Sequence, residues 1–492
     1  MADEREMRLQ RLHALRERGI NPYPNSVQRT HTIAQVLEHF EEWQGPEGSF
    51  TLTGRLRLMR DMGKAAFAQI EDGTGRIQVY FRINDIGEDA YKMLKLLDLG
   101  DFIEVTGFLF VTRSGERTLH AHEFRIIAKG LRPLPEKYHG LEDREIRQRK
   151  RYLDLIANGD EARQVFITRS RAITAMRHYL DEHGFIEVET PVLQPLYGGA
   201  TARPFITHHN TLDRDLYLRI AVELYLKRLI IGGFERVYEI GRNFRNEGID
   251  RNHNPEFTMM ECYQAYADYD DIMKLVEEMI YFIVQEVKGT NRIAYQGTEI
   301  DLTPPWPRYR LLDAIEEFTG INVNRFSDRE SLAAEMRAQG YDADPNLGRG
   351  RLIDDLKGAM FRKSIPALRQ ALFLTDYPLD VSPLTKSHRE LPGLVERFQP
   401  FIGGLELGNA FTELNDPLDQ RARFEDQMRQ RSQGDDEAQV LDEDFLEAME
   451  VGMPPTGGVG IGIDRLAMLL ADQESIRDVI LFPTMRKTAE EQ

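Results

Sequence analysis

The sequence predicts an α+β protein in which a small β-barrel precedes a larger domain of helices packed on an antiparallel sheet. Two observations predict this class. Residues 50–127 hold short runs of alternating apolar and polar residues separated by turn signals such as DGTG and SGE, as half-buried strands do. Beyond residue 150, strand-like runs joined by hairpins or loops are accompanied by separately grouped helical stretches, which favours helices on an antiparallel sheet.

Length and composition limit the protein classes that fit. The chain has 492 residues, and at roughly 150 residues per domain it holds about three compact units or two unequal ones. Its 41% hydrophobic and 29% charged residues are typical of globular proteins and exclude collagen, coiled-coil and disordered chains. The net charge of -18 argues against a generally cationic surface, although a local basic patch is enough to bind nucleic acid.

Cysteine content and hydropathy indicate the compartment. The only cysteine, Cys262, excludes a disulfide within the chain and a zinc site built from cysteines. No run approaches the about 20 apolar residues of a membrane span. Residues 1–19 alternate charge and leucine instead of forming the apolar core of a secretion signal. We therefore expect a cytoplasmic protein.

Residues 1–48 are predicted to form N-terminal helices. Four apolar residues of the segment 5–18 recur at near-helical spacing, and Gly19 is a stop signal; they are Met7, Leu9, Leu12 and Leu15. A second short helix is expected around residues 32–43. The first segment has five arginines against two glutamates, so it forms either a solvated amphipathic helix or an auxiliary contact to RNA phosphates.

Residues 49–135 are predicted to form a five-stranded barrel of the OB type, because five strand-like runs and one helix, near residues 88–97, follow one another. Such barrels bind single-stranded nucleic acid by stacking bases on aromatic rings beside basic groups, although small barrels have many other uses. A linker is expected over residues 136–150, with the domain boundary near residue 140.

The second domain, residues 151–492, opens with an amphipathic helix that Gly184 ends. Its apolar face consists of Ala172, Ile173, Met176, Tyr179 and Leu180. Strand-like runs such as FIEVETPVL, RVYEIGRNFRN and GLELGNAFTEL follow. Residues 308–372 combine helical stretches with Gly- and Asp-rich turns, which indicates a helical insertion between the strands of the sheet.

The first of three chemically dense segments lies between residues 234 and 266. Seven charged or titratable residues occur within 23 positions, half of them on apolar strands: Glu239, Arg242, Arg245, Glu247, His253, Glu256 and Glu261. A hairpin that exposes Arg245 would present its guanidinium fork to a phosphate or carboxylate. A surface loop of salt bridges is the alternative.

The second segment, GGLELGNAFTELND, contains Glu406 and Glu413 in an otherwise apolar strand, with Asn409 and Phe411 between them. Strand alternation places Glu406 on the face opposite the other three, unless a bulge at Gly408 shifts the phase. Carboxylates in such a strand require a cation, an ammonium group or Mg2+.

The third segment, TGGVGIGIDRLAMLL, has glycines at positions 457, 458, 460 and 462 followed by a helix start with Asp464 and Arg465. It forms either a tight strand-to-helix turn or a bed for adenine with an arginine that reaches a distal phosphate. The sequence lacks a G-x-x-x-x-G-K-[ST] loop and a dinucleotide-binding glycine fingerprint. A nucleotide would therefore bind without the common phosphate cradles.

These segments resemble the signature motifs of class II aminoacyl-tRNA synthetases, and the match is close to the lysyl-tRNA synthetase family of class IIb. The resemblance covers RYLDL, GFIEVETPVL, FERVYEIGRNFRNEG, LGNAFTELNDP and GIGIDRLAMLL, and runs from about residue 50 to the C-terminus. It implies an OB-fold anticodon domain, a catalytic domain on a six-stranded antiparallel sheet, and a homodimer built around Pro191. It also implies an ATP-dependent lysine–tRNA ligase that uses Mg2+, forms lysyl-adenylate and charges the 3' end of tRNA(Lys).

The resemblance also implies roles for individual residues. Arg245 would bind the ATP α-phosphate and the amino-acid carboxylate, and Arg465 the γ-phosphate; both are the expected catalytic residues. The other expected ATP-binding residues are Glu247, His253, Phe257 and Glu406. The expected lysine-binding residues are Gly199, Glu223, Glu261, Tyr263, Asn409, Phe411 and Glu413. The expected anticodon-binding residues are Arg60, Phe67, Gln78 and Glu123.

Two positions depart from the family's pattern. Gln399 stands where the family usually has a glutamate that ligates Mg2+ together with Glu406, so the resemblance puts one metal position in doubt. Val222 stands where the family often has proline, which we interpret as a conformational detail.

The chemistry of the pocket favours lysine over other amino acids. A lysine side chain needs an apolar tube that ends in acids, which Glu261 and Glu413 provide with Tyr263, while Phe411 packs on the stem. An aspartate or asparagine pocket would end in Arg or Lys instead. Three alternatives stay open: an aspartyl or asparaginyl relative, a synthetase-like binding module without activity, and an enzyme that lysylates a protein, whose relatives usually lack the barrel.

Overall fold

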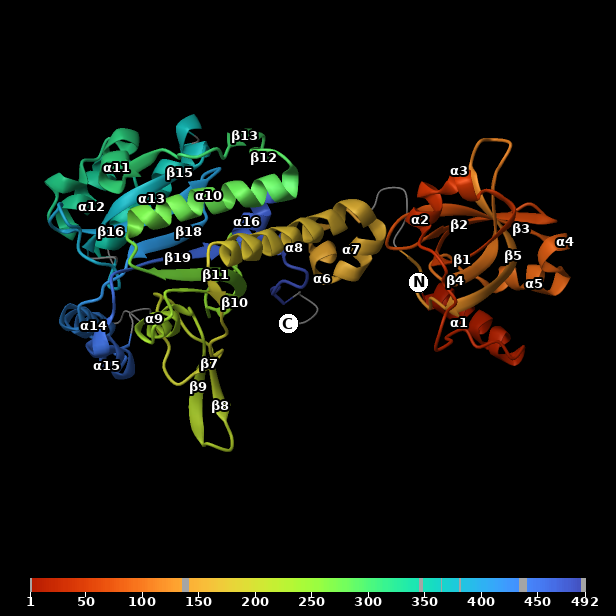
Figure 1. The fold of residues 1–492 in the computed structure, drawn as a ribbon, viewed down its shortest axis with the longest axis horizontal. Coiled ribbons are helices and arrows are strands. Elements are labelled where there is room, and N and C mark those ends of the chain that lie inside the picture. Colours follow the sequence, from red (N-terminus) through yellow and green to blue (C-terminus); the bar gives the residue numbers. More distant parts are fainter. Residues whose placement is uncertain are drawn as a thin grey trace. The chain divides into compact units, whose positions relative to one another are not determined.

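The computed structural model describes residues 2–134, 141–344, 348–363, 365–379, 382–432 and 440–487. The chain divides into two compact units (Figure 1). One comprises residues 1–143 with 156–158, and the other comprises residues 144–155 with 159–492. The predicted linker, residues 136–150, lies partly outside the described residues, and its described end contains helix α6 (Arg144–Arg149).

The first unit contains a closed five-stranded barrel in the order β1-β2-β3-β5-β4, which confirms the predicted fold. The strands are β1 (Gly45–Asp61), β2 (Ala65–Glu71), β3 (Arg76–Arg82), β4 (Phe102–Val111) and β5 (Arg117–Ala128). Two short helices, α4 (Ile83–Ile86) and α5 (Glu88–Met93), connect β3 to β4. Alternate residues of each strand point inward and form the core, among them Leu52, Val79 and Ile103, as the period of two requires.

Three helices precede the barrel, namely α1 (Ala2–Glu17), α2 (Ile33–Glu38) and α3 (Phe40–Trp43). Helix α1 ends before Gly19, whose φ of 74° is in the region that favours glycine. Two of its arginines are engaged within the unit. Arg8 donates hydrogen bonds to the carbonyl oxygens of Leu99 and Gly130, and Arg11 pairs with Asp98. The positive charge available to RNA on this helix is therefore smaller than the sequence indicates.

The second unit is built on a sheet in the order β14-β15-β16-β18-β19-β11-β10-β6. The strands are β14 (Arg308–Arg310), β15 (Leu372–Pro378), β16 (Leu394–Ile402), β18 (Gly408–Thr412), β19 (Thr456–Gly462), β11 (Glu256–Ala265), β10 (Arg236–Phe244) and β6 (Ile186–Glu187). The middle six strands are antiparallel, as predicted. The antiparallel expectation is wrong at both edges, where β14 and β6 run parallel to their neighbours.

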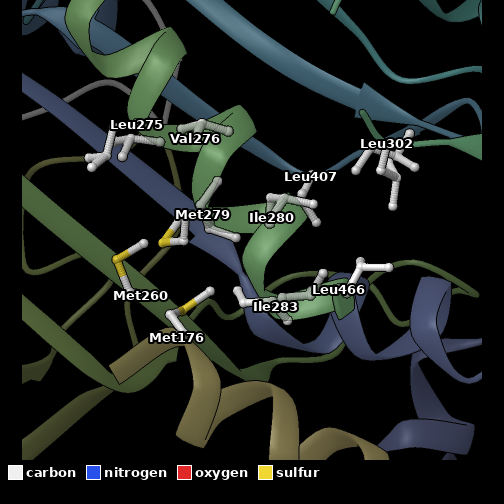
Figure 2. Close-up of a cluster of buried hydrophobic side chains, with 14 of the residues drawn as sticks. Met176, Met260, Leu275, Val276, Met279, Ile280, Ile283, Leu302, Leu407 and Leu466 are labelled. Carbon is white, nitrogen blue, oxygen red and sulfur yellow. The ribbon is translucent and has the colours of Figure 1, made fainter. Parts of the chain in front are cut away.

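One face of this sheet is covered by helices α8 (Gly159–Glu182), α10 (Tyr269–Lys288) and α16 (Ile463–Leu470). Figure 2 shows Met176 of α8 and Met279 of α10 beside Met260 of β11, with Ile280 and Ile283 of α10 in the same buried cluster. Helix α10 begins at a capping box on Asp268 and ends at Gly289 in the left-handed conformation, both of which are common helix-end signals. This packing leaves the opposite face of the sheet to carry the polar side chains.

The helical insertion joins two neighbouring parallel strands, β14 and β15. It contains α11 (Leu311–Thr319), α12 (Arg329–Ala338) and α13 (Arg349–Arg362). Its apolar side chains, which include Leu332, Leu352 and Leu356, form one buried cluster with residues of β15 and β16. The insertion falls within residues 308–372, the range that the sequence predicts. A parallel pair needs a crossover connection, and these helices supply it.

The remaining elements of the second unit lie around this frame. They are α7 (Arg151–Ala157), β7 (Leu193–Gln194), β8 (Ile206–His209), β9 (Arg214–Leu218), α9 (Glu223–Ile231), β12 (Arg292–Tyr295), β13 (Thr298–Asp301), β17 (Leu405–Glu406), α14 (Pro417–Ser432), α15 (Glu443–Gly452) and α17 (Ile476–Val479). Among the residues that the structure describes, no helix is long and apolar enough to cross a membrane.

Candidate active site

A cavity of about 400 Å3 opens on the sheet face opposite the helices. Strand alternation explains its position, because Met260 and Cys262 of β11 point into the helix-covered core while Glu261 and Tyr263 line the cavity. Every residue that the sequence analysis assigned to ATP, lysine or the metal lies in its wall. The structure thus brings together side chains that come from seven separate stretches of chain.

Glu406 reaches this face through a bulge. Glu406 of β17 pairs with Phe401 of β16, whereas Phe411 of β18 pairs with Arg397. Between these two pairs the chain advances five residues through β17 and β18 but only four along β16. The extra residue changes the face of the sheet to which the preceding side chains point. Glu406 consequently lies in the same cavity wall as Asn409, Phe411 and Glu413. The sequence left this point conditional on a bulge at Gly408.

Arg245 follows the end of β10, where its backbone N–H donates to the Pro255 carbonyl oxygen (2.8 Å) and closes the loop. Its guanidinium carbon lies 5.0 Å from the centre of the Phe257 ring, within cation–π range. Burial lowers the pKa of Arg245, although Glu247 and Glu261 oppose this shift. Its Nε is buried and has no hydrogen-bond partner among the described residues, which leaves one donor for an anionic ligand.

Arg465 lies in the first turn of α16 and is held from two sides. Its Nη1 donates to the backbone oxygen of Glu406 (2.8 Å), and its Nη2 lies 3.3 Å from Nε2 of His253. The neighbouring Asp464 has a structural role: its carboxylate pairs with Arg169 (2.6 Å) and accepts the Thr258 backbone N–H (2.7 Å). The start of α16 is therefore fixed to β11 and α8, and Arg465 is directed to the cavity.

The glycines of β19 make room for the side chains opposite. A Cβ atom at Gly458 would lie 2.3 Å from Oε1 of Glu413 and 2.5 Å from Cε1 of Tyr263, and one at Gly460 would lie 2.8 Å from Met259. These separations are far below van der Waals contact. The glycine run thus permits the acidic end of the cavity to form against a flat strand.

Three buried carboxylates form one end of the cavity: Glu223, Glu261 and Glu413 are between 1% and 5% exposed. The completely buried Lys227 lies between two of them, with Nζ 2.6 Å from Oε1 of Glu223 and 2.5 Å from Oε2 of Glu413. The sequence analysis missed Lys227 and expected an uncompensated acidic end. Its position four residues after Glu223 on one helix was the available signal.

The electrostatics of this end favour a cationic guest. Burial, together with the charge of Glu223, raises the pKa of Glu261 to about 7. Burial also raises the pKa values of Glu223 and Glu413 despite the attraction of Lys227. Burial acts to lower the pKa of Lys227, but the two facing carboxylates outweigh it and the pKa is raised. The three carboxyl groups at this end thus outnumber the one buried ammonium group there. An ammonium group of a ligand would therefore stabilise their ionised forms.

Glu261 is oriented by two donors, the Tyr263 hydroxyl (3.2 Å) and the backbone N–H of Val222 (3.4 Å). A proline at position 222 has no N–H and could not make the second contact. Val222 therefore contributes to the acidic end directly, which is more than the conformational detail that the sequence indicated.

The residues suggested for a metal differ in how well they fit one. Glu406 presents its carboxylate to the cavity. Gln399 is buried, and its Oε1 accepts hydrogen bonds from the Tyr377 hydroxyl (2.6 Å) and from Lys357 Nζ (3.0 Å). No group of three or more His, Cys, Asp or Glu side chains that could hold a metal ion occurs within the described parts of the chain. Glu406 is therefore a fitting ligand and Gln399 is not.

The barrel presents a second candidate site, an aromatic row across its outer surface. Cross-strand neighbours follow one another in the order Arg60, Phe67, Tyr80, His120 and Phe108, one from each strand. The rings of Phe67 and Tyr80 are 4.9 Å apart, those of Tyr80 and His120 are 5.1 Å apart, and Phe108 stacks on His120 at 4.7 Å.

Of the other predicted anticodon residues, Gln78 lies two positions before Tyr80 on β3 and donates to the Thr118 hydroxyl (2.9 Å). Glu123 is exposed on β5 opposite Thr106, beside an irregularity in the strand register. Sequence reasoning missed Tyr80, Phe108 and His120, although the aromatic residues in alternating positions of these strands were a usable signal.

Comparison with known proteins agrees with the fold. The family described as "tRNA synthetases class II (D, K and N)" matches residues 143–486, and the "OB-fold nucleic acid binding domain" family matches residues 50–127. The chain belongs to the class II tRNA synthetases and is an enzyme of the aminoacyl-tRNA synthetase class, which confirms the resemblance seen in the sequence.

Curated relatives narrow the family further. Proteins named lysine–tRNA ligase from Moorella thermoacetica and Chloroflexus aurantiacus are each 52% identical to this chain, over 98% and 99% of both proteins, respectively. The protein of that name from Carboxydothermus hydrogenoformans is 53% identical over 98% of this chain and 97% of its own length. Within its class, the chain belongs to the family of lysine–tRNA ligases.

Proposed function

We propose that this protein activates L-lysine with ATP to form lysyl-adenylate and transfers the lysyl group to the 3' end of tRNA(Lys). The observation that carries the proposal is the pairing of two features in one cavity. One end holds three buried carboxylates, and Arg245 keeps a buried, unpartnered Nε in the same wall. An amino acid with a second ammonium group at the end of its side chain can pair with both features: its carboxylate with Arg245 and its ammonium groups with the acidic end.

Charge balance supports lysine as the amino acid. Glu223 and Glu413 pair with the ammonium group of Lys227, and Glu261 lies at the same end of the cavity, so two negative charges are left when all four groups are ionised. L-lysine carries two ammonium groups, which would balance those charges, and one carboxylate, which would pair with Arg245. In this proposal Gly199 and Glu223 hold the α-ammonium group and Glu261, Tyr263 and Glu413 the ε-ammonium group, while Asn409 and Phe411 line the stem.

Adenylate formation requires positioning and charge stabilisation and no general base. The lysine carboxylate oxygen forms a bond to the α-phosphorus in line, the bond to the bridging oxygen breaks, and diphosphate leaves. Arg245 would stabilise the α-phosphate and Arg465 the γ-phosphate. Phe257 would stack on adenine, and Glu247 and His253 would complete the nucleotide site. Mg2+, which Glu406 would hold, supplies additional positive charge to the phosphate oxygens when bound.

In our proposal the barrel reads the anticodon. The rings of Phe67 and Tyr80 lie side by side on the outer surface with Arg60 at the end of the row, an arrangement that suits bases stacked on aromatic side chains beside a phosphate-binding group. Gln78 and Glu123 would supply hydrogen bonds to base edges, which single-stranded RNA exposes.

We further propose a homodimer formed around Pro191 and a cytoplasmic location. Pro191 is exposed, and large apolar side chains near it are 40–64% exposed, namely Val192, Leu193, Leu196 and Ile206. Apolar groups at this density support a protein interface. The only cysteine, Cys262, is buried and free, which suits a reducing compartment.

Diphosphate exchange into ATP, measured with each of the twenty amino acids in turn, tests the catalytic proposal. Lysine should be the amino acid that stimulates exchange. Stimulation by aspartate or asparagine would instead favour the neighbouring members of the class. The absence of exchange with every amino acid would favour a binding module, and exchange with lysine without tRNA(Lys) charging would favour an enzyme that lysylates a protein.

A further inference from the structure

Lys357 of helix α13 directs its ammonium group to the position where the family resemblance expects a metal ion. Its Nζ lies 3.0 Å from Oε1 of Gln399, 3.1 Å from Oδ1 of Asp354 and 3.8 Å from Oε2 of Glu406. The lysine side chain is only 12% exposed. An ammonium group has three donors, and here three side-chain oxygen atoms surround it.

Gln399 cannot also serve as a ligand for Mg2+ in this arrangement. A side-chain amide oxygen has two lone pairs, and Oε1 of Gln399 accepts from both Lys357 and the buried Tyr377 hydroxyl. The orientation of the amide is fixed by these partners, because an ammonium group can only donate. Both lone pairs of the oxygen are therefore in use within the protein.

The charges agree with this assignment. A glutamate at position 399 would form with Glu406 a pair of carboxylates that attracts a dication. Gln399 is neutral, and the carboxylate of Glu406 lies 3.8 Å from the ammonium group of Lys357. Position 399 thus has a neutral amide in place of a carboxylate, and a mostly covered lysine lies beside it. Both features have the same effect, which is to replace a bound cation by a covalently attached one.

We propose that the Lys357 ammonium group takes the place of one divalent cation at the Gln399–Glu406 position. This enzyme would then bind one metal ion fewer in each active site than an enzyme with glutamate at position 399 and no lysine beside it. Lys357 is then a positioning residue that holds Glu406 and Gln399 in the cavity wall. This inference rests on the proposed ATP-dependent function, and the experiments below separate the two.

Counting bound Mn2+ is the first test. The full-length protein is saturated with L-lysine and α,β-methylene-ATP, which cannot form adenylate, and bound Mn2+ is determined from the loss of the free-ion electron paramagnetic resonance signal. The double variant K357M/Q399E should bind one Mn2+ more per active site than the wild type. Equal numbers in the two proteins would overturn the proposal. The variant K363M, on an exposed lysine that follows the same helix and donates to the Phe318 carbonyl oxygen, should give the wild-type number.

A second measurement does not depend on the folding of the double variant. Crystals of the wild-type protein with the same ligands and Mn2+ are examined by anomalous scattering. We expect Lys357 to contact Gln399 and the anomalous map to show no manganese peak within coordination distance of Oε1 of Gln399. A manganese ion at that position would contradict the inference.

Kinetics of the single variants complete the test. K357M should raise the KM for ATP in lysine-dependent exchange about tenfold, because one charge-assisted contact is lost. K357R, which keeps the positive charge, should have a KM close to that of the wild type. A wild-type KM in K357M would count against a positioning role. If the wild type shows no lysine-dependent exchange, the proposed function fails; if it exchanges normally but matches the double variant in Mn2+ number, only the present inference fails.

Discussion

Replacement of Lys227 by methionine should destabilise the second compact unit by about 3–5 kcal/mol, which is the usual cost of removing one partner from a buried ion pair. Lys227 is completely buried, and its ammonium group lies 2.6 Å from Glu223 and 2.5 Å from Glu413. Methionine preserves most of the apolar stem, so the lost interaction is mainly electrostatic. The two carboxylates then have no counter-charge from position 227.

The loss should increase with pH. Burial already raises the pKa values of Glu223 and Glu413, and removal of the cation raises them further. A carboxyl group whose pKa is higher in the folded state binds its proton more tightly there, so its contribution to stability is present at low pH and is lost as the pH rises through that pKa. The variant should therefore be weakest, relative to the wild type, above the raised pKa values of Glu223 and Glu413, of which that of Glu413 is about 8.

The assay is urea unfolding at about pH 6 and about pH 9, followed by circular dichroism and by the fluorescence of Trp306, which is buried in the same unit. A matched control is K274M on helix α10, where the lysine side chain is 70% exposed and lies 3.9 Å from Glu278. The control should change the free energy of unfolding by less than about 0.5 kcal/mol. If K227M and K274M have the same free energy of unfolding at about pH 9, the charge arrangement proposed for the acidic end is wrong.

Four further outcomes follow from the site. Arg245→Ala and Arg465→Ala should each abolish lysine-dependent diphosphate exchange with an unchanged circular dichroism spectrum; exchange at the wild-type rate in either would refute their roles. Phe67→Ala should raise the tRNA KM by an amount worth about 1–3 kcal/mol of stacking, with tRNA-independent exchange unaffected; an unchanged KM would exclude the barrel contact. Gly458→Ala should weaken lysine binding in calorimetry because its Cβ overlaps Glu413 and Tyr263; wild-type affinity would disprove the packing argument. Lysine binding near pH 6 should release protons, because Glu261, with a pKa of about 7, must ionise to pair with the ligand; heats that do not depend on the buffer would contradict this.

Much of the architecture could be predicted from local pattern. Alternation of apolar and polar residues located the five barrel strands, and the spacing of Ala172, Met176 and Tyr179 located the buried face of α8. These features follow from periodicity, which each segment carries by itself. The direction of the edge strands β6 and β14 could not be read in this way, because parallel or antiparallel pairing depends on how distant segments meet.

Some features of the candidate site could likewise be predicted from local sequence pattern, and others could not. The segments around Arg245, Glu413 and Arg465 could be identified because several polar residues interrupt apolar strands at short spacing. The spacing of Lys227 from Glu223 was a local signal that the sequence analysis did not use, whereas the contact of Lys227 with Glu413 and those of Lys357 depend on the tertiary fold. The phase of Glu406 depends on a single extra residue in the strand, which alternation alone cannot reveal.

The most direct test of the account compares the binding of L-lysine with that of L-norleucine, which has a terminal methyl group in place of the ammonium group, by calorimetry on the full-length protein. If buried carboxylates recognise the distal ammonium, lysine should bind about 10^4-fold more tightly, because the analogue leaves those groups unpaired. Comparable affinities for the two ligands would show that the acidic end does not select the amino acid.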